Sequence, residues 1–168
     1  NLTGKQEVDI IAHSLGGLLV KKYVVDNPQA NYIGKAVFVG VPNTGAPKSI
    51  KVLLQGDNLG VLGLNDEEIK KISKNTPGVY DLLPSLQYYN VLQNSFVQTV
   101  DRVAPIGTGI ENLDFEESRE FLINHSLNQQ AIANGENLHT DIFDNFDLRT
   151  AGVDLYSIVG CRAGTLEK

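Results

Sequence analysis

The sequence predicts an α/β protein, with a doubly wound core of parallel strands that is interrupted by a long, mostly helical insertion. Three observations support this fold class. A strand, a helix and a second strand follow one another within residues 8–40, which is the pattern of a βαβ unit. Residues 41–152 show no comparable strand pattern, and a third buried strand is expected at residues 153–160.

The βαβ unit is predicted from apolar patterning. The first strand is expected at residues 8–12, where Val-Asp-Ile-Ile-Ala is nearly continuously apolar. Apolar residues then recur at helical spacing from Leu15 to Val25, and Pro28 follows the helix. The second strand is expected at residues 35–40. Strands this apolar are typical of parallel sheets that are covered on both faces.

The segment between the second and third strands favours turns and helices. Residues 42–47 combine Pro, Asn and Gly and predict a turn. Asn65 precedes acidic residues in the pattern of a helix N-cap. Helices are also expected at 115–123 and 127–143, with Gly135 interrupting the second. The chain therefore divides into a core segment at 1–47, a mostly helical cap-like or lid-like insertion at 48–151, and a returning core strand at 152–168.

The composition is that of an ordinary globular domain. The 168 residues are 42% hydrophobic and 20% charged, and about 100–200 residues commonly form one domain. The net charge of −6 argues against a nucleic-acid partner. No apolar run approaches the roughly 20 residues of a membrane span, and no signal peptide is recognised. We expect a soluble protein, secreted or cytoplasmic, without an internal disulfide because Cys161 is the one cysteine.

The stretch Ala12-His13-Ser14-Leu15-Gly16 joins the first strand to the helix and is the main candidate for a catalytic site. A serine with small residues two positions away on each side matches the G-x-S-x-G nucleophile elbow, with Ala12 in place of the first glycine. In such a turn the Ser14 hydroxyl is the nucleophile and the Leu15 backbone N–H stabilises an oxyanion. The alternative is a loop serine that caps the helix, with the glycines present for packing.

His13 adjoins Ser14 but is not expected to be its base. Neighbouring side chains at a sharp turn point in different directions, whereas a base must come within about 3 Å of the serine oxygen. We expect His13 to have a packing or supporting role.

Four segments of the chain carry a family resemblance. They are DIIAHSLGGLLVKKYV at 9–24, VFVGVPNTGAPKSI at 37–50, VYDLLPSLQYY at 79–89 and LHTDIFDNFDLRTAGVDLYSIVG at 138–160. These segments resemble the α/β-hydrolase superfamily, in particular lecithin:cholesterol acyltransferase-like and related bacterial lipases. The resemblance implies a partial α/β-hydrolase fold and ester chemistry on acyl lipids or similar esters. It also implies a Ser-His-Asp triad and no metal or organic cofactor.

Two roles carry over residue by residue: Ser14 as the nucleophile and the Leu15 backbone N–H as one oxyanion donor. In the family pattern the second donor precedes the nucleophile, and the acid and the histidine follow the third strand. None of these is recognised, since Glu167 is the one carboxylate after that strand and its setting does not match. With the absence of methionine, this predicts a fragment of a larger catalytic domain that is inactive by itself.

Other polar residues are not expected to complete the site. His125 and His139 fall on expected helices of the insertion, and Asp154 lies at the N-terminal end of the third strand. Catalytic groups of open α/β sheets lie at the carboxyl ends of the strands. His139 and Asp141 lack a further metal ligand at a suitable spacing. The acidic residues at 114–120 predict an exposed helix start.

Two other functions stay open. An acyltransferase would pass the acyl group to an alcohol through the same acyl-enzyme. A non-catalytic pseudo-hydrolase module would bind a lipid or a partner instead. The expected partners are an acyl-ester or lipid small molecule, a lipid or membrane surface contacted through the insertion, and further copies of the chain joined at exposed sheet edges.

Overall fold

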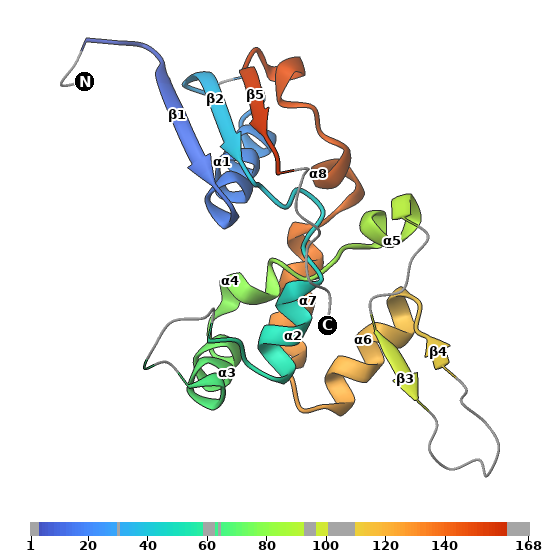
Figure 1. Ribbon diagram of the computed structural model, residues 1–168. Coiled ribbons are helices and arrows are strands. Elements are labelled where there is room, and N and C mark those ends of the chain that lie inside the picture. Colours follow the sequence, from blue (N-terminus) through green and yellow to red (C-terminus); the bar gives the residue numbers. More distant parts are fainter. Residues whose placement is uncertain are drawn as a thin grey trace. The chain divides into compact units, whose positions relative to one another are not determined.

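The computed structural model describes residues 4–29, 31–58, 63, 65–92, 97–100 and 110–160. The chain forms two compact units. The first, here called the sheet unit, consists of Asn1–Asn43 and Thr140–Lys168. The second, the helical unit, consists of Thr44–His139. Figure 1 shows the strands of the first unit in blue and red, and the helices of the second unit in colours from cyan through green to orange.

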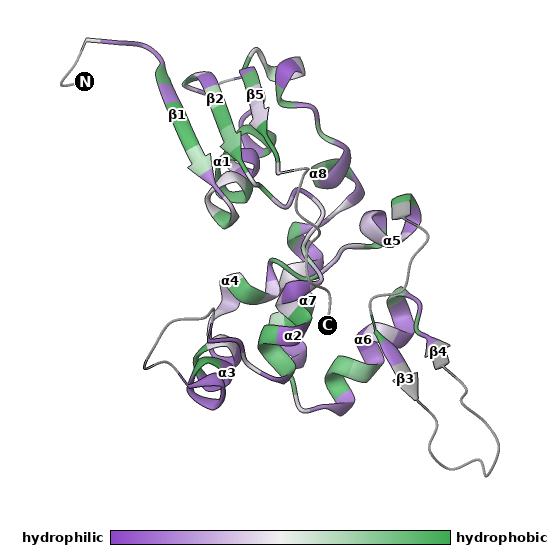
Figure 2. Cartoon of the chain, in the orientation of Figure 1, coloured by the Kyte–Doolittle hydropathy of each residue, from purple (hydrophilic) through white to green (hydrophobic). Residues whose placement is uncertain are grey.

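The sheet unit contains a parallel three-stranded sheet in the order β1-β2-β5. Its strands are β1 (Val8–His13), β2 (Ile33–Val39) and β5 (Asp154–Ile158), and α1 (Leu15–Asp26) connects the first two. This arrangement confirms the predicted α/β class, the βαβ unit and the returning strand. Figure 2 shows β1 and β2 to be hydrophobic over most of their length.

One face of this sheet is covered. Residues of α1 and of the segment before β5 pack against Ala12, Ala36 and Phe38, which are nearly inaccessible to solvent. On the opposite face Ile11, Val37 and Tyr156 form one row across the three strands. Ile11 is 79% and Tyr156 51% exposed. The expectation that both faces are covered is therefore wrong for the part of the chain that the structure describes.

The expected helix at 127–143 is two helices. The first, α7 (Gln129–Leu138), ends at His139, and the second, α8 (Asp141–Asn145), begins after Thr140, whose hydroxyl accepts a hydrogen bond from the Phe143 amide. The expected break at Gly135 is wrong, because Gly135 lies inside α7. A side chain there would clash with the Tyr80 carbonyl. Gly135 therefore brings α7 close to the backbone of α4.

The second segment of the sheet unit begins at Thr140, earlier in the chain than residue 152. The short 3₁₀ helix η1 (Leu148–Ala151) belongs to the sheet unit, as does α8. Leu148 and Val153 are each 2% exposed and pack in the same hydrophobic cluster as the strands. Their burial explains why residues 140–151 associate with the sheet.

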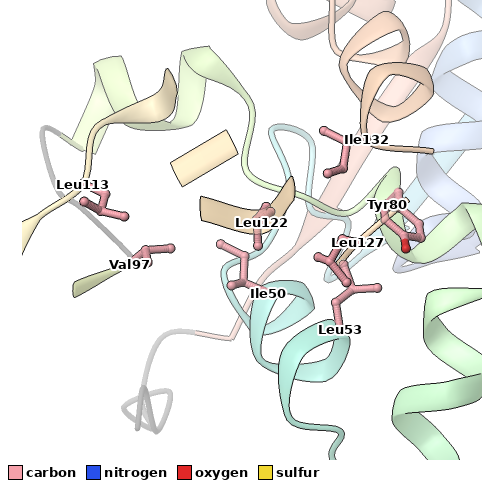
Figure 3. Packing of buried hydrophobic residues seen from close by; sticks show 8 residues of the cluster. All are labelled: Ile50, Leu53, Tyr80, Val97, Leu113, Leu122, Leu127 and Ile132. Atoms are coloured by element: carbon pink, nitrogen blue, oxygen red, sulfur yellow. The ribbon is translucent and has the colours of Figure 1, made fainter. Parts of the chain in front are cut away.

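The helical unit has its own hydrophobic core, drawn in Figure 3. The buried residues are Ile50, Leu53, Tyr80, Val97, Leu113, Leu122, Leu127 and Ile132. They come mainly from helices, but an antiparallel pair of short strands that the sequence analysis did not predict lies beside Val97 and Leu113. The elements are α2 (Lys48–Leu54), α3 (Asp66–Lys74), α4 (Pro77–Tyr80), α5 (Leu86–Leu92), β3 (Gln98–Val100), β4 (Ile110–Asn112), α6 (Phe115–Asn124) and α7.

Local capping fixes where two of these helices begin. The Asn65 side chain accepts a hydrogen bond from the Glu67 amide at the start of α3, as predicted. At the start of α6, Asp114 and Glu117 form a reciprocal capping box. The acidic residues of this region thus satisfy helix amides, which agrees with the expected exposed helix start.

Candidate functional site

Ser14 lies in a strained turn between β1 and α1. Its backbone has φ 52° and ψ −130°, and the Ser14 amide donates to the Val39 carbonyl at 3.0 Å. The Gly17 amide donates in turn to the Ser14 carbonyl at 2.9 Å. A non-glycine residue at positive φ costs about 1–3 kcal/mol and persists only where the surroundings impose it. Here the end of β2 and the first turn of α1 hold the residue in place.

The glycines after Ser14 differ in what they do. A Cβ atom at Gly17 would overlap the side chain of Val41, which follows β2. Glycine is therefore required where α1 packs against this residue. A Cβ atom at Gly16 would meet no described atom within 4 Å beyond its chain neighbours and the backbone of its own helix. Space around the described residues therefore does not require glycine at this position. On the strand side, Ala12 is 6% exposed and packs in the core of the sheet unit.

The hydroxyl of Ser14 is not used for capping. No side-chain capping hydrogen bond joins Ser14 to α1, so the described residues give no support to the alternative that Ser14 is a helix cap. Leu15 is the first residue of α1, and the amides of a first helical turn have no partner within the helix. The helix dipole adds partial positive charge at the same position. The turn thus combines an uncommitted hydroxyl with N–H groups suited to an anion.

The three histidines have separate surroundings. His13 is the exposed last residue of β1, paired in register with Val39. Nδ1 of His125 lies 2.8 Å from the Phe121 carbonyl, and the His125 ring lies against the Phe121 ring at 3.9 Å between centroids. Nε2 of His139 lies 2.8 Å from the Asp81 carbonyl. The two histidines of the helical unit are therefore held by main-chain oxygens of their own unit.

The carboxylates considered from the sequence do not reach Ser14 within the sheet unit. Asp154 is the first residue of β5 and pairs with Lys35, whereas Val39, which binds the Ser14 amide, pairs with Ile158 at the other end. Glu167 lies outside the described residues. Among the residues described, no group of three or more His, Cys, Asp or Glu side chains could hold a metal ion.

A buried lysine in the sheet unit escaped the sequence analysis. Lys21 of α1 is 3% exposed, its Nζ donates to the Asp144 carbonyl at 3.2 Å, and the same atom lies 4.8 Å from the centre of the Phe143 ring. Burial lowers the pKa of Lys21, and the negative charge of Asp144 partly opposes this. Helical spacing places Lys21 on the same inner face of α1 as the buried Leu18 and Val24.

Two of the motifs that carry the family resemblance bind each other in the helical unit. The Ala46 amide donates to the Leu82 carbonyl at 2.8 Å, and the Ser85 amide donates to the Thr44 carbonyl at 2.9 Å. The buried Ser49 hydroxyl lies 2.8 Å from the Ala46 carbonyl and 3.0 Å from that of Leu82. No residue pattern indicates this pairing, because hydrogen bonds between main-chain groups leave no pattern in side chains.

Comparison with known proteins places the chain in a family. The family model described as lecithin:cholesterol acyltransferase matches residues 1–167. The chain belongs to this family. The membership confirms the resemblance to lecithin:cholesterol acyltransferase-like proteins, and the parallel sheet with its connecting helix is consistent with a partial α/β-hydrolase fold.

One curated protein to which the chain is similar is the phosphatidylcholine-sterol acyltransferase of Gallus gallus. It is 32% identical to this chain over 75 residues, which are 43% of the chain and 18% of the relative. The aligned part thus covers less than a fifth of that protein. Within the described part of the chain, every helix is too short or too polar to cross a bilayer.

Proposed function

We propose that this chain carries the nucleophile of an enzyme that cleaves or transfers acyl esters. Ser14 is the nucleophile, and the Leu15 amide is one donor of the oxyanion hole. The observation that carries this proposal is the strained Ser14 backbone between β1 and α1, with a hydroxyl that caps no amide of α1. Membership of the lecithin:cholesterol acyltransferase family supports it.

The proposed reaction forms an acyl-enzyme. Ser14 Oγ attacks the ester carbonyl carbon while a base takes its proton, and the carbonyl oxygen becomes an oxyanion near the Leu15 amide. The ester C–O bond then breaks, and the alcohol leaves with the proton. Water or a second alcohol afterwards takes the acyl group from Ser14. Hydrolysis and transfer share every step before this last one.

The base, the acid and a second oxyanion donor are proposed to come from residues outside this chain. The orientation argument disfavours His13, and the rings of His125 and His139 each lie against a main-chain carbonyl. We therefore expect little or no activity from this chain by itself. A serine without a base has no efficient route for losing its proton.

The substrate class is proposed from the relative. Its name specifies phosphatidylcholine and a sterol, which favours an acyl lipid as donor and makes transfer to an alcohol the second candidate for the reaction. A product assay with and without an acceptor alcohol separates transfer from hydrolysis. Contact with a lipid surface through the helical unit and self-association at the edges of β1 and β5 are further proposals.

A fluorophosphonate probe tests the nucleophile directly. Ser14 Oγ would displace fluoride from phosphorus, and intact mass would report the adduct. The probe is applied to this chain and to a longer polypeptide that contains it, beside Ser14→Ala. The matched control is Ser126→Ala, because Ser126 is the other serine at positive φ among the described residues.

Three outcomes decide the proposal. Labelling of the longer polypeptide alone, lost in Ser14→Ala and kept in Ser126→Ala, is the expected result. Labelling of Ser14 in this chain as well would show that a histidine of the chain, or of a second copy, serves as base. Labelling of neither polypeptide would overturn the nucleophile assignment and favour a non-catalytic lipid-binding or partner-binding module.

A further inference from the structure

The helical unit contains a pocket of about 260 Å³. It lies between α5, α6 and α7, so all of its lining residues belong to one unit. Apolar side chains form most of its wall, among them Leu86, Tyr89, Phe115, Leu122 and Ile132. The volume is near the lower end of the roughly 300–1,000 Å³ that is typical of ligand pockets. A single short apolar chain matches this size.

An ion pair on the wall supplies the main polar feature. Nε of Arg119 on α6 lies 2.7 Å from Oε1 of Glu136 on α7, and the two side chains are 29% and 32% exposed. This contact uses one donor of the guanidinium and one oxygen of the carboxylate. A guanidinium has five N–H donors and a carboxylate about four acceptor positions. The pair therefore presents a donor and an acceptor side by side.

Three other polar side chains on the wall, those of Ser118, Tyr89 and His139, already have partners in the protein. The hydroxyl of the buried Ser118 lies 3.4 Å from the Leu113 carbonyl and also makes a hydrogen bond with Tyr89. Burial raises the pKa of Tyr89, as expected of an apolar surrounding. His139 lies against the Asp81 carbonyl. A ligand would thus meet its polar contacts at Arg119 and Glu136.

The charge of the wall selects against anions. Its acidic and basic residues, the tyrosine apart, are Glu116, Arg119, Glu136 and His139. Two carboxylates face one guanidinium, so a carboxylate or phosphate headgroup would be repelled. A hydroxyl is both a donor and an acceptor, and it can therefore bind both members of the ion pair at once.

We propose that this pocket binds an uncharged alkyl alcohol, with the chain among Leu86, Phe115 and Leu122 and the hydroxyl beside the Arg119–Glu136 ion pair. The hydroxyl donates to the Glu136 carboxylate and accepts from the Arg119 guanidinium. Binding needs no reaction at Ser14, so the proposal is independent of the proposed function. Ser14→Ala is accordingly used as the background for every measurement.

The first test is a titration of unbranched 1-alkanols into the Ser14→Ala chain, followed by amide chemical shifts and calorimetry. Affinity should rise about fourfold per added methylene, the fold-change that corresponds to about 0.8 kcal/mol. The rise should stop once the pocket is full, and the shifts should concentrate on α5, α6 and α7. An affinity independent of chain length, or shifts confined to the sheet unit, would overturn the proposal.

Headgroup and mutant series test the hydroxyl contact. The alkyl methyl ether, which accepts but cannot donate, and the alkanoate of equal length should each bind about tenfold more weakly than the alcohol, as expected for the loss of a charge-assisted hydrogen bond. Glu136→Gln should reduce this preference for the alcohol, whereas the exposed Glu120→Gln should not. Equal or tighter binding of the alkanoate would exclude the proposed ligand class.

A blocking variant tests the location. Leu86 is 53% exposed at the pocket, so Leu86→Trp adds bulk there with little expected effect on the core. Ile72→Trp is the matched control, because Ile72 on α3 is 61% exposed and does not line the pocket. Leu86→Trp should abolish alkanol binding and leave the circular dichroism unchanged. Unchanged binding in this variant would place the alcohol elsewhere and refute the assignment.

Discussion

Among the residues that the structure describes, each unit contains one serine at positive φ, and the two occur for different reasons. Ser126 in the helical unit has φ 62° and follows α6. Its amide donates to the Ile123 carbonyl at 3.0 Å, and the Leu127 amide donates to the Leu122 carbonyl at 3.2 Å. This is the hydrogen-bond pattern of a Schellman motif, which ends many helices with a residue in the left-handed region.

Ser14 in the sheet unit has no such role. It precedes a helix, its ψ of −130° lies outside the left-handed helical region, and its side chain caps nothing on α1. A strained serine is therefore not by itself a sign of catalysis. What distinguishes Ser14 is that helix termination does not explain its strain, whereas Ser126 is explained by the hydrogen bonds around it.

The largest effect is expected at the turn of Ser126. Leu127 is 5% exposed and belongs to the core of the helical unit, where Leu122 is also buried. Leu127→Ala should lower the free energy of unfolding by about 2–5 kcal/mol, as measured by urea denaturation. The exposed Val91→Ala on α5 is the control and should change it by less than about 0.5 kcal/mol. Equal effects would mean that the turn does not depend on this packing.

The turn of Ser14 depends on the close packing of the α1 backbone. Alanine substitutions at Gly16 and Gly17 distinguish the effect of this packing on stability from the effect of helix propensity. Gly17→Ala places a methyl group against Val41 and should cost about 1–3 kcal/mol, the usual range for overpacking. Gly16→Ala adds a methyl group in open space and should be neutral or stabilising by up to about 1 kcal/mol. Urea denaturation of both variants is the measurement. Destabilisation by Gly16→Ala would show that the close approach is at Gly16 after all.

The difference between the two turns also shows what the sequence could predict. The Ser14 turn follows from a local pattern of apolar strand, small residues and apolar helix, so both its position and its neighbours were recognisable. The caps at Asn65 and Asp114 are local in the same sense. Arg119 and Glu136 lie 17 positions apart on different helices. No spacing rule joins them, so the pocket and its ion pair became visible only in three dimensions.

The strands β3 and β4 and the end of α7 were missed for related reasons. The strands have three residues each, too few for a period of two to be recognised. Gly135 has the weakest helix propensity of its segment, yet its close contact with Tyr80 keeps it inside α7. In both cases tertiary packing decided what local preference left open.

Replacing Ser14 or Ser126 by glycine compares the backbone strain of the two turns. Ser14→Gly should stabilise the sheet unit by about 1–2 kcal/mol relative to Ser14→Ala, because glycine removes a strain that alanine retains. Ser126→Gly should stabilise by less than about 1 kcal/mol, since its turn is already hydrogen-bonded in the favoured way. Thermal unfolding of the three variants gives the ranking. A larger gain at Ser126 would reverse the distinction drawn between the two turns.

The smallest effect is expected from the lysine that α1 buries behind the Ser14 turn, because the contacts of Lys21 with Asp144 and Phe143 offset part of its burial. Burial lowers the pKa of Lys21 below its ordinary value of 10.5. The unfolded chain therefore binds the proton more tightly than the folded chain. The free-energy cost of burying the charged lysine is complete below the pKa that Lys21 has in the folded chain. This cost is relieved as the pH rises from that pKa towards 10.5.

Lys21→Met isolates this contribution. The difference in unfolding free energy between the variant and the parent should favour the variant most at neutral pH and shrink as the pH rises. Lys22→Met is the control, because Lys22 is exposed and pairs with Asp26 on the surface of α1. If the difference in unfolding free energy between Lys21→Met and the parent stays constant up to pH 10.5, the contacts of Lys21 in the folded chain fully compensate the burial of its charge.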